Sequence, residues 1–568
     1  MLCASLSGPT SAWAEATAPS PAADLVLTNG RVRTPSGWAE ALAVRSGVIV
    51  AVGSAQSMVP LQGAATRVLD LRGATVLPGL HDVHVHPMYA GITELQCRIA
   101  QGSTLAQTQA RVRECAQRAA AGEWVLGGQW DAPALGASPH RAALDKVSQS
   151  HPVFLEDTSG HSAWVNSRAL ALAGIDAHSK DPAGGIIERD RSGMPTGVLR
   201  ESATDLVRSH IPPPTVAQLR EALQRSLKTM LSFGITSYTE AAVGFVAGPE
   251  RELAAYGELS GEPGLIKPRA TLCITWTPGS TESERAIETR NLYARGRVDP
   301  SCVKIFLDGV PTDSHTAAML EPYAGTADGR ADHAARYGML LVKQDILDEA
   351  VTRFDRMGLT VKFHAAGDAA VRAGLDAIAA ARRANGYSGL MHNVGHCTFV
   401  APEDIARARQ IGATLEVSPY LWGPTPINDS IVAAVGPETI KRVWPVREML
   451  DAGALVVPGS DWSVVPSVNP WIGIETLVTR AVPGGSTQTF GKAEAITLPE
   501  ALALFTENAA RQERAANRLG RIEPGLLADF IVLDRNPYEI RIEDVHDTKV
   551  AMTFINGELV YTAGAQAP

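Results

Sequence analysis

Apolar runs and amphipathic segments alternate along most of the chain. Eight short runs are apolar throughout or nearly so, which is typical of parallel strands buried on both faces. The segments between them have helical periodicity; one of them, 215–233, places Leu219, Leu223, Leu227 and Leu231 on one face. This alternation predicts an α/β fold, a (β/α)8 TIM barrel, with a doubly wound sheet as the alternative. The expected strands are 76–84, 235–241, 269–276, 302–308, 360–364, 391–397, 413–419 and 455–461.

Short strands and tight turns replace this alternation at both ends of the chain. Asn29-Gly30 and Ser46-Gly47 each separate two β-prone runs near the N-terminus, and Asn556-Gly557 does the same near the C-terminus. Asn-Gly between such runs is a strong hairpin signal. Because neither end alone buries much surface, we expect one composite β-sandwich domain from residues 24–75 and 514–568. The barrel domain then covers residues 76–513.

The segment 88–214, which follows the first expected strand, is too long for an ordinary loop. It contains a helical stretch at 104–121 and β-like pieces at 124–127 and 153–155, and prolines at 212–214 close it. We therefore expect an inserted region that lies over the mouth of the barrel as a lid.

Composition narrows the classes of function. The chain is 45% hydrophobic and 20% charged, which is ordinary for a globular enzyme. Its net charge of -9 argues against a nucleic acid or a membrane surface as a partner. No apolar run is long enough to span a bilayer. The six cysteines form no C-x-x-C pair, so we interpret them as scattered core residues rather than as a zinc or redox motif.

Residues 1–23 differ in composition from the rest of the chain. They are rich in Ala, Ser, Pro and Thr, and Ala12-Trp13-Ala14 fits a small-x-small cleavage site. The basic region that should precede such a site is missing, which a start codon assigned too far downstream would explain. We expect a leader or signal remnant on a periplasmic or secreted protein. The alternative is a disordered leader on a cytoplasmic protein.

The candidate chemistry begins where the first expected strand ends, in His84-Val85-His86. Residues two apart in a strand point to the same face, so both imidazoles can reach one metal ion. Taken alone, the pair fits two structural histidines equally well. His364, His396 and Asp461 lie at the ends of later strands, and the carboxyl ends of barrel strands converge on one face. So many candidate metal ligands at the same end of the barrel would seldom occur by chance, so we expect a metal site there.

Lys304 is a charged residue within the apolar run 302–308. A buried, unpaired ammonium is costly, and it cannot bind a metal. One interpretation is an ion pair, for example with Asp308 or Asp461. The other is a carboxylated lysine, an anion able to bridge two metal ions that lie about 3.5–4 Å apart.

These residues lie in motifs that resemble the metal-dependent amidohydrolase superfamily, and within it the amidohydrolase-3 branch of YtcJ-like proteins and N-substituted formamide deformylases. The motifs are P-G-L-H-D-V-H-V-H-P, G-H-S-A-W-V-N-S-R-A-L, V-K-I-F-L-D-G, H-A-A-G-D-A-A-V, G-S-D-W-S-V and G-L-L-A-D-F-I-V-L-D. The resemblance extends over residues 24–560. It implies the barrel, the composite sandwich and the lid, with one or two zinc ions, or other divalent transition metals, as the cofactor. The implied ligands are His84, His86 and Asp461 for one metal, and His364 and His396 for the other, with carboxylated Lys304 as the bridge.

The sixth expected strand departs from this pattern. The related motif usually reads I-E-H-A, whereas here it reads Val394-Gly395-His396-Cys397. A glycine thus stands where the related motif has an acid before the histidine. This difference puts in question how tightly the site would bind the second metal. His392 is a competing ligand, because it shares the strand parity of His396.

The expected chemistry is hydrolysis by a metal-activated hydroxide, with Asp461 as the general base that passes the proton to the leaving amine. His161, in G-H-S-A-W, is a further catalytic or substrate-binding candidate, with a structural role in the lid as the alternative. Aromatic residues that fall near strand ends are candidates for an apolar pocket, with packing in the core as the alternative. These substrate-binding candidates are Trp164, Trp276, Trp422 and Trp462.

The sequence therefore predicts an enzyme that hydrolyses a C–N bond other than a peptide bond, in an amide, N-acyl or N-formyl group of a small organic substrate. One alternative is ester, carbamate or lactone hydrolysis at the same site. Another is a metal- or ligand-binding protein with weak catalysis, against which the intact Asp461 argues. No G-x-S-x-G elbow supports a serine hydrolase. We expect a small-molecule substrate as the partner, and a homodimer is an open alternative.

Overall fold

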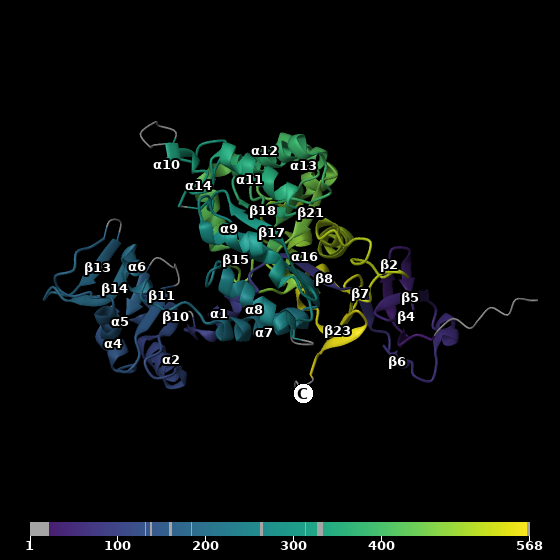
Figure 1. The fold of residues 1–568 in the computed structure, drawn as a ribbon, viewed down its shortest axis with the longest axis horizontal. Coiled ribbons are helices and arrows are strands. Elements are labelled where there is room, and N and C mark those ends of the chain that lie inside the picture. The colour runs from purple at the N-terminus through teal and green to yellow at the C-terminus, as the bar shows by residue number, and fades with distance from the viewer. Residues whose placement is uncertain are drawn as a thin grey trace, which may run out of the picture.

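The computed structural model describes residues 22–564 except 101, 131, 137–138, 158–161, 183–184, 262–264, 313 and 327–332. A strand-and-helix barrel occupies the centre of the molecule (Figure 1). In this view the sheets built from the two ends of the chain lie on one side of it, and the insertion lies on the other. No helix in the described part of the chain is both long and apolar enough to cross a bilayer.

The central sheet has eight parallel strands, and each pairs with the next in chain order. This is the strand order of a (β/α)8 barrel, as predicted; a doubly wound sheet would reverse its order partway. The two outer strands meet where the Asp461 N–H donates to the His84 carbonyl at 2.8 Å. A Cβ on Gly459 would lie 2.3 Å from the Cβ of His84, so glycine permits this approach. The strands are β8 (Leu80–Val85), β15 (Ile235–Val243), β16 (Arg269–Thr275), β17 (Val298–Phe306), β18 (Thr360–Ala365), β19 (Asn393–His396), β20 (Thr414–Val417) and β21 (Leu455–Pro458).

Helices connect these strands and cover the outside of the sheet (Figure 1). The predicted helix 215–233 is α7 (Val216–Ser232). It begins with a capping box in which Thr215 and Gln218 satisfy each other's backbone N–H groups, and it buries its leucine face. Later connections include α8 (Pro249–Gly261), α9 (Thr281–Thr289), α11 (Gln344–Arg356), α12 (Asp368–Asn385), α13 (Pro402–Ile411), α14 (Pro426–Thr439), α15 (Val446–Asp451) and α16 (Pro470–Thr479).

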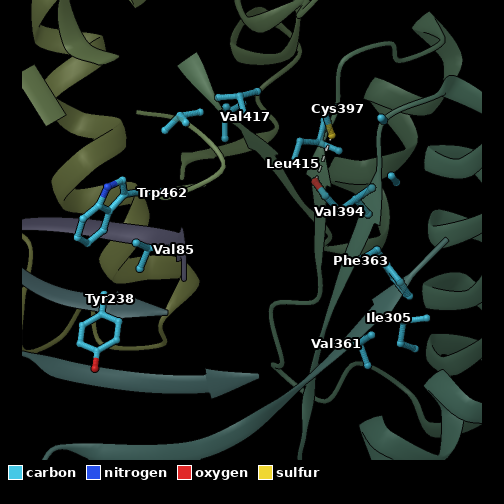
Figure 2. Close-up of a cluster of buried hydrophobic side chains, with 14 of the residues drawn as sticks. Val85, Tyr238, Ile305, Val361, Phe363, Val394, Cys397, Leu415, Val417 and Trp462 are labelled. Atoms are coloured by element: carbon cyan, nitrogen blue, oxygen red, sulfur yellow. Dashed lines mark hydrogen bonds between the residues drawn. The ribbon is translucent and has the colours of Figure 1, made fainter. Parts of the chain in front are cut away.

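Along each barrel strand, apolar side chains that face the surrounding helices alternate with residues that face the inside of the barrel. Figure 2 shows apolar residues of neighbouring strands gathered in the core. Residues next to them in sequence point to the other face of the sheet, inside the barrel, because successive strand residues face opposite sides. The core set includes Ile305, Phe363, Val394 and Leu415. The adjacent inward-facing set includes Lys304, Lys362, Gly395 and Glu416.

The expected single strand 76–84 is two strands. β7 (Thr75–Pro78) pairs with strands from both ends of the chain, and only β8 belongs to the barrel. Gly79 joins them, and a Cβ there would lie 2.2 Å from the hydroxyl oxygen of Thr236. The chain therefore passes from one sheet to the other through a residue with no side chain, which an apolar run does not reveal.

Two sheets are built from the terminal segments. One has the order β5 (Val48–Gly53), β4 (Ala41–Arg45), β1 (Leu25–Thr28) and β6 (Arg67–Asp70). The other has the order β24 (Glu558–Thr562), β23 (Val550–Ile555), β22 (Phe530–Leu533), β7, β2 (Arg31–Thr34) and β3 (Gly37–Ala39). Leu27 and Val44 of the first sheet share one hydrophobic cluster with Val76, Phe530 and Phe554 of the second. The two ends of the chain therefore share a sheet and a core.

The insertion has its own mixed sheet and its own hydrophobic clusters. It follows α1 (Pro87–Leu95), the helix after the first barrel strand, and it contains the expected helical stretch as α2 (Leu105–Arg118). Figure 1 shows it as a lobe beside the barrel. Its strands are β9 (Cys97–Arg98), β10 (Val125–Trp130), β11 (Val153–Asp157), β12 (Ser162–Val165), β13 (Gly185–Arg189) and β14 (Pro195–Glu201).

The interpretation of the cysteines as scattered core residues is wrong for four of them. Cys97 and Cys115 form a disulfide within the insertion, with Cα atoms 5.8 Å apart. Cys273 and Cys302 are register partners in β16 and β17 and form a second disulfide. Pairing of this kind depends on register between strands far apart in sequence, which spacing alone does not reveal. Cys397 is free and buried.

Candidate metal centre

The six predicted metal ligands come together at the carboxyl ends of the barrel strands. His86 Nε2 lies 3.2 Å from Asp461 Oδ1, and His84 Nε2 lies 3.7 Å from the same oxygen. The His396 ring is 4.7 Å from that of His84 and 4.6 Å from that of His364, measured between centroids. Lys304 Nζ is 3.4 Å from His84 Nε2. Strands one, four, five, six and eight of the barrel thus contribute to one group.

Each of the four histidines turns its Nδ1 toward an oxygen outside this group. A carboxylate only accepts, so an imidazole bound to one through Nδ1 carries its proton there and leaves Nε2 free for a metal. Three of the partners are carboxylates and one is a hydroxyl. The pairs are His84 with Glu416, His364 with Asp308 at 3.0 Å, His396 with Ser418 at 3.3 Å, and His86 with Glu240 at 3.6 Å.

The donor set fits a divalent transition metal. Ligand atoms of His84, His86 and Asp461 all lie within 4.8 Å of one another, as do those of His84, His396 and Glu416. Burial holds the pKa of His84 and of His396 well below the usual value, with nearby positive charge adding to the effect. Both rings therefore favour the neutral form in which an imidazole binds a metal.

His86 and Asp461 have opposite proton preferences. Burial lowers the pKa of His86, but the carboxylates of Asp461 and Glu240, which lie 3.2 and 3.6 Å from its ring nitrogens, outweigh it and raise the pKa to about 9. For Asp461, burial favours the neutral acid, but the hydrogen bond from His86 and the charge of His396 lower its pKa overall. Asp461 has φ 60°, a left-handed conformation that Asp tolerates better than most residues. An ionised carboxylate is thus held at the end of the eighth strand, beside the histidines.

Lys304 is fully buried, with only 1% of its surface exposed. Burial, together with the charge of nearby Lys362, lowers its pKa to about 7. Its Nζ also lies 5.0 Å from the centre of the Phe306 ring. Across the described residues, no carboxylate comes within ion-pair distance of this nitrogen.

Asp308, one expected ion-pair partner of Lys304, is engaged elsewhere. It accepts hydrogen bonds from His364 Nδ1 and from the N–H groups of Ala366, Gly367 and Ala318, all at 2.9–3.0 Å. The carboxylate therefore fixes the His364 ring and the loop after β17 together.

Comparison with known proteins agrees with this geometry. A model of the amidohydrolase family matches residues 67–561. The chain belongs to the amidohydrolase family. Its relatives include the protein LONG AFTER FAR-RED 3 of Arabidopsis thaliana, 30% identical over 95% of this chain and 92% of that protein. The putative amidohydrolase YtcJ of Bacillus subtilis is 27% identical, over 92% and 96% of the two chains. The N-substituted formamide deformylase of Arthrobacter pascens is 28% identical, over 95% and 98%.

A solved structure supports the same assignment. The fold matches that of an uncharacterized metal-dependent hydrolase from Pyrococcus furiosus with a TM-score of 0.73 and 26% identity. The match covers 91% of this chain and all of the other. The predicted membership of the amidohydrolase-3 branch is therefore confirmed, and the chain has the fold of metal-dependent amidohydrolases.

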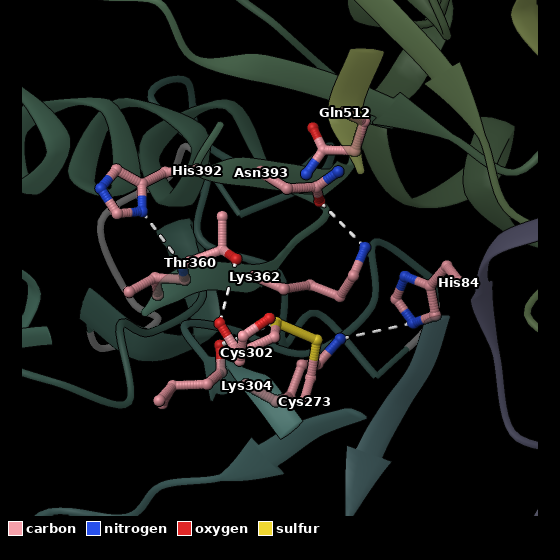
Figure 3. The surroundings of a disulfide bond; sticks show 12 residues. His84, Cys273, Cys302, Lys304, Thr360, Lys362, His392, Asn393 and Gln512 are labelled. Atoms are coloured by element: carbon pink, nitrogen blue, oxygen red, sulfur yellow. Dashed lines mark hydrogen bonds between the residues drawn. A yellow bond between two sulfur atoms is a disulfide. The ribbon is translucent and has the colours of Figure 1, made fainter. Parts of the chain in front are cut away.

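Sequence reasoning missed several polar groups of this amidohydrolase site. Glu416 accepts hydrogen bonds from His84 Nδ1 and from Lys362 Nζ, and Lys362 also donates to Asn393 Oδ1 at 3.2 Å. Figure 3 shows Lys362 and Lys304 side by side, reaching Asn393 and His84, close to the Cys273–Cys302 disulfide. The available signal was a single charged residue within each of two apolar strands.

Asp82 was also missed. Its Oδ1 accepts hydrogen bonds from the N–H groups of Ser460 at 3.0 Å and of His84 at 3.2 Å. It therefore joins the first barrel strand to the segment after the eighth, next to the expected ligands His84 and Asp461. Burial raises the pKa of Asp82 to about 7.

His392, the competing ligand, lies outside the centre. Its Nδ1 accepts the N–H of Val361 at 3.0 Å, and its Nε2 lies 3.0 Å from Asp355 Oδ1. Both ring nitrogens are therefore engaged in the fold, and the proposal that it competes with His396 is wrong.

Three of the four candidate tryptophans contact residues outside the histidine group, whereas Trp462 adjoins it and His161 lies outside the described residues. His161 belongs to the residues that the structure does not describe. Among the tryptophans, Trp164 packs against Trp130 in the insertion, Trp276 donates to Glu284 at 2.8 Å, Trp422 stacks on Trp444, and the Trp462 carbonyl accepts from the His86 N–H at 2.7 Å. None of the four is more than 6% exposed.

Two phenylalanines lie beside the histidines instead. The Phe245 ring is 6.1 Å from that of His86 and 56% exposed, and the Phe306 ring is 5.8 Å from that of His364. Both follow or end barrel strands, as the tryptophans were expected to do. The position of an aromatic residue after a strand therefore does not indicate whether its side chain faces the histidines or the hydrophobic core.

Proposed function

We propose that the protein is a metal-dependent hydrolase that cleaves an amide, N-acyl or N-formyl C–N bond of a small organic substrate. The observation that carries this proposal is that the rings of four histidines lie together at one end of the barrel, and that two of them, His84 and His86, face the Asp461 carboxylate through Nε2. The relative named as a formamide deformylase supports the choice of bond.

In this proposal His84, His86 and Asp461 hold one zinc ion, and His364 and His396 hold a second. A bound zinc ion supplies Lewis acidity: it lowers the pKa of water toward about 7 and polarises a carbonyl. Asp461 accepts the proton of the attacking water and returns it to the leaving amine. Its position supports this role, because its Oδ1 faces both His84 and His86 while 16% of its side chain remains exposed.

We also propose that Lys304 is carboxylated, a form in which it would be able to hold both metals. Its burial disfavours the ammonium form, and its Nζ lies within 3.4 Å of a metal-facing histidine nitrogen. A neutral amine can add carbon dioxide, with loss of one proton, to give the carbamate anion. The anion would join the buried site as a ligand, whereas the ammonium would repel both metals.

The proposed units of the chain are a composite β-sandwich domain of residues 24–78 and 514–568, which β7 extends by three residues beyond the expected 24–75, a barrel domain that begins with β8 and runs to 513, and a lid of 88–214. The insertion leaves the barrel after β8, the strand that carries His84, which supports a role at the catalytic end. Residues 1–23 are proposed as a leader.

We place the protein in the periplasm or outside the cell. Two disulfides support this placement, because such bonds persist in oxidising compartments and are rare in the cytosol. Expression in an exporting host, followed by fractionation and thiol alkylation, tests it. We expect an exported protein in which Cys97, Cys115, Cys273 and Cys302 resist alkylation until reduction. A cytosolic protein with all four reactive after unfolding would contradict it.

The function is tested with zinc-loaded protein on matched substrates. N-formyl amines, N-acyl amino acids and p-nitroanilides are compared with esters of the same acyl groups, and His84→Ala serves as the inactive control. We expect at least one amide to be hydrolysed with a higher kcat/KM than its ester, and no turnover by the variant. Hydrolysis of esters alone, or equal turnover by His84→Ala, would overturn the proposal.

A further inference from the structure

The carboxylate of Glu416 is the most deeply buried acidic group beside the metal centre. It is 0% exposed in β20, inside the barrel. One oxygen accepts from His84 Nδ1 and the other accepts from Lys362 Nζ. Lys362 is itself held by Asn393 Oδ1 at 3.2 Å. A chain of polar contacts therefore crosses the barrel interior from strand six to strand one and ends on a metal-facing histidine.

Gly395 makes room for this carboxylate. Gly395 and Glu416 are Cα register partners in β19 and β20. A Cβ on Gly395 would lie 2.6 Å from Glu416 Oε1 and 2.9 Å from its Cδ, both closer than real Cβ contacts. Gly395, which stands where the resemblance leads us to expect an acid, is therefore the residue that admits an acid from the neighbouring strand.

We infer that Glu416 is a positioning residue that sets His84 as a metal ligand, and that Gly395 and Glu416 together move this acid from strand six to strand seven. The inference rests on the proposed metal-dependent function. Glu416 fixes the proton of His84 on Nδ1, so that Nε2 faces Asp461 and Lys304. An acid on the far nitrogen of a ligating imidazole also raises its basicity, and loss of such a partner typically costs about 10- to 100-fold in metal affinity.

Two other roles for Glu416 make different predictions. As a purely structural ion pair with Lys362, it would affect the stability of the fold and leave metal affinity unchanged. As a direct ligand with His84 and His396, a grouping that its distances allow, it would need to give up its hydrogen bond to His84. Only the positioning role predicts that an acid at position 395 can replace Glu416. In that role the carboxylate is needed beside His84 Nδ1, whichever strand carries it.

The first experiment measures zinc affinity by competition with a chromogenic chelator, with no substrate present. We expect Glu416→Ala and Gly395→Glu each to weaken zinc binding by about 10- to 100-fold, and the double variant to regain at least part of that affinity, because the acid at 395 replaces the one lost at 416. Thr414→Val is the matched control. It also removes a buried polar atom from β20, but the Thr414 hydroxyl makes no hydrogen bond to a histidine.

A second variant guards against misfolding. Glu416→Ala leaves the Lys362 ammonium buried without its partner, so Lys362→Met is added to remove that charge. We expect this double variant to recover the wild-type melting temperature without zinc but not the zinc affinity. Wild-type affinity in Glu416→Ala or in Glu416→Ala/Lys362→Met would overturn the positioning role. Gly395→Glu/Glu416→Ala with no gain over Glu416→Ala would overturn the exchange of the acid. A wild-type protein that binds no metal would refute the proposed function as well.

Discussion

Replacing Asp461 by Asn separates its role as a base from its role as a ligand. Asn is similar in shape, keeps one ligating oxygen, and tolerates the left-handed backbone at φ 60°. The Asp461 N–H bond to the His84 carbonyl, which helps to close the barrel, does not involve the side chain. We therefore expect Asp461→Asn to fold and to retain at least one metal. What it loses is basicity at an oxygen 3.2 Å from His86 Nε2.

The expected loss follows from the usual contribution of general-base catalysis, so kcat should fall by about 10²–10⁴-fold. Metal content and kcat are measured on the same preparation of Asp461→Asn, because a fall in occupancy alone would mimic a catalytic effect. Asp461→Ala is the comparison variant; it should lose metal as well as activity, since it removes the ligating oxygen. Near-normal turnover by Asp461→Asn at full occupancy would remove Asp461 from the mechanism and leave His161 as the candidate base.

Three further predictions concern the bridge, the histidine support and the terminal sheet. Lys304→Ala should lose one metal equivalent, and short carboxylic acids should restore part of it; an active enzyme with a free Lys304 ammonium paired to Asp461 would disprove carboxylation. Asp308→Ala should weaken metal binding by about 10- to 100-fold, because His364 loses the acceptor on its Nδ1; unchanged affinity in a chelator titration would contradict this. Deletion after Asn517 should lower the melting temperature sharply, because it removes the β22 partner of β7; a fully stable, active truncation would refute the shared sheet.

The barrel could be predicted because its strands are buried on both faces, which leaves apolar runs in the sequence. The grouping of the candidate ligands could be predicted because the carboxyl ends of barrel strands meet, whatever the length of the loops between them. Both predictions can be made without knowledge of which residues are neighbours on adjacent strands. This is why His84, His364 and Asp461 could be predicted to lie close together although they are far apart in the chain.

The features that could not be predicted depend on which residues are neighbours on adjacent strands. Cys273 pairs with Cys302 only because β16 and β17 are in register at that level. Lys362 is a charged residue in an apolar strand, but its partner Glu416 lies two strands away inside the barrel, and the sequence does not show that the two meet. The tryptophans illustrate the same point: the contact of Trp276 with Phe354 is decided by helix packing, which the strand pattern does not contain.

The central claim is that His84, His86, Lys304, His364, His396 and Asp461 form a metal centre on which activity depends. Elemental analysis of the purified protein, followed by chelation and reloading with zinc, tests it most directly. We predict one or two equivalents of bound transition metal, loss of hydrolysis on chelation, and recovery on addition of zinc. A protein that contains no transition metal and keeps its activity after chelation would contradict the account.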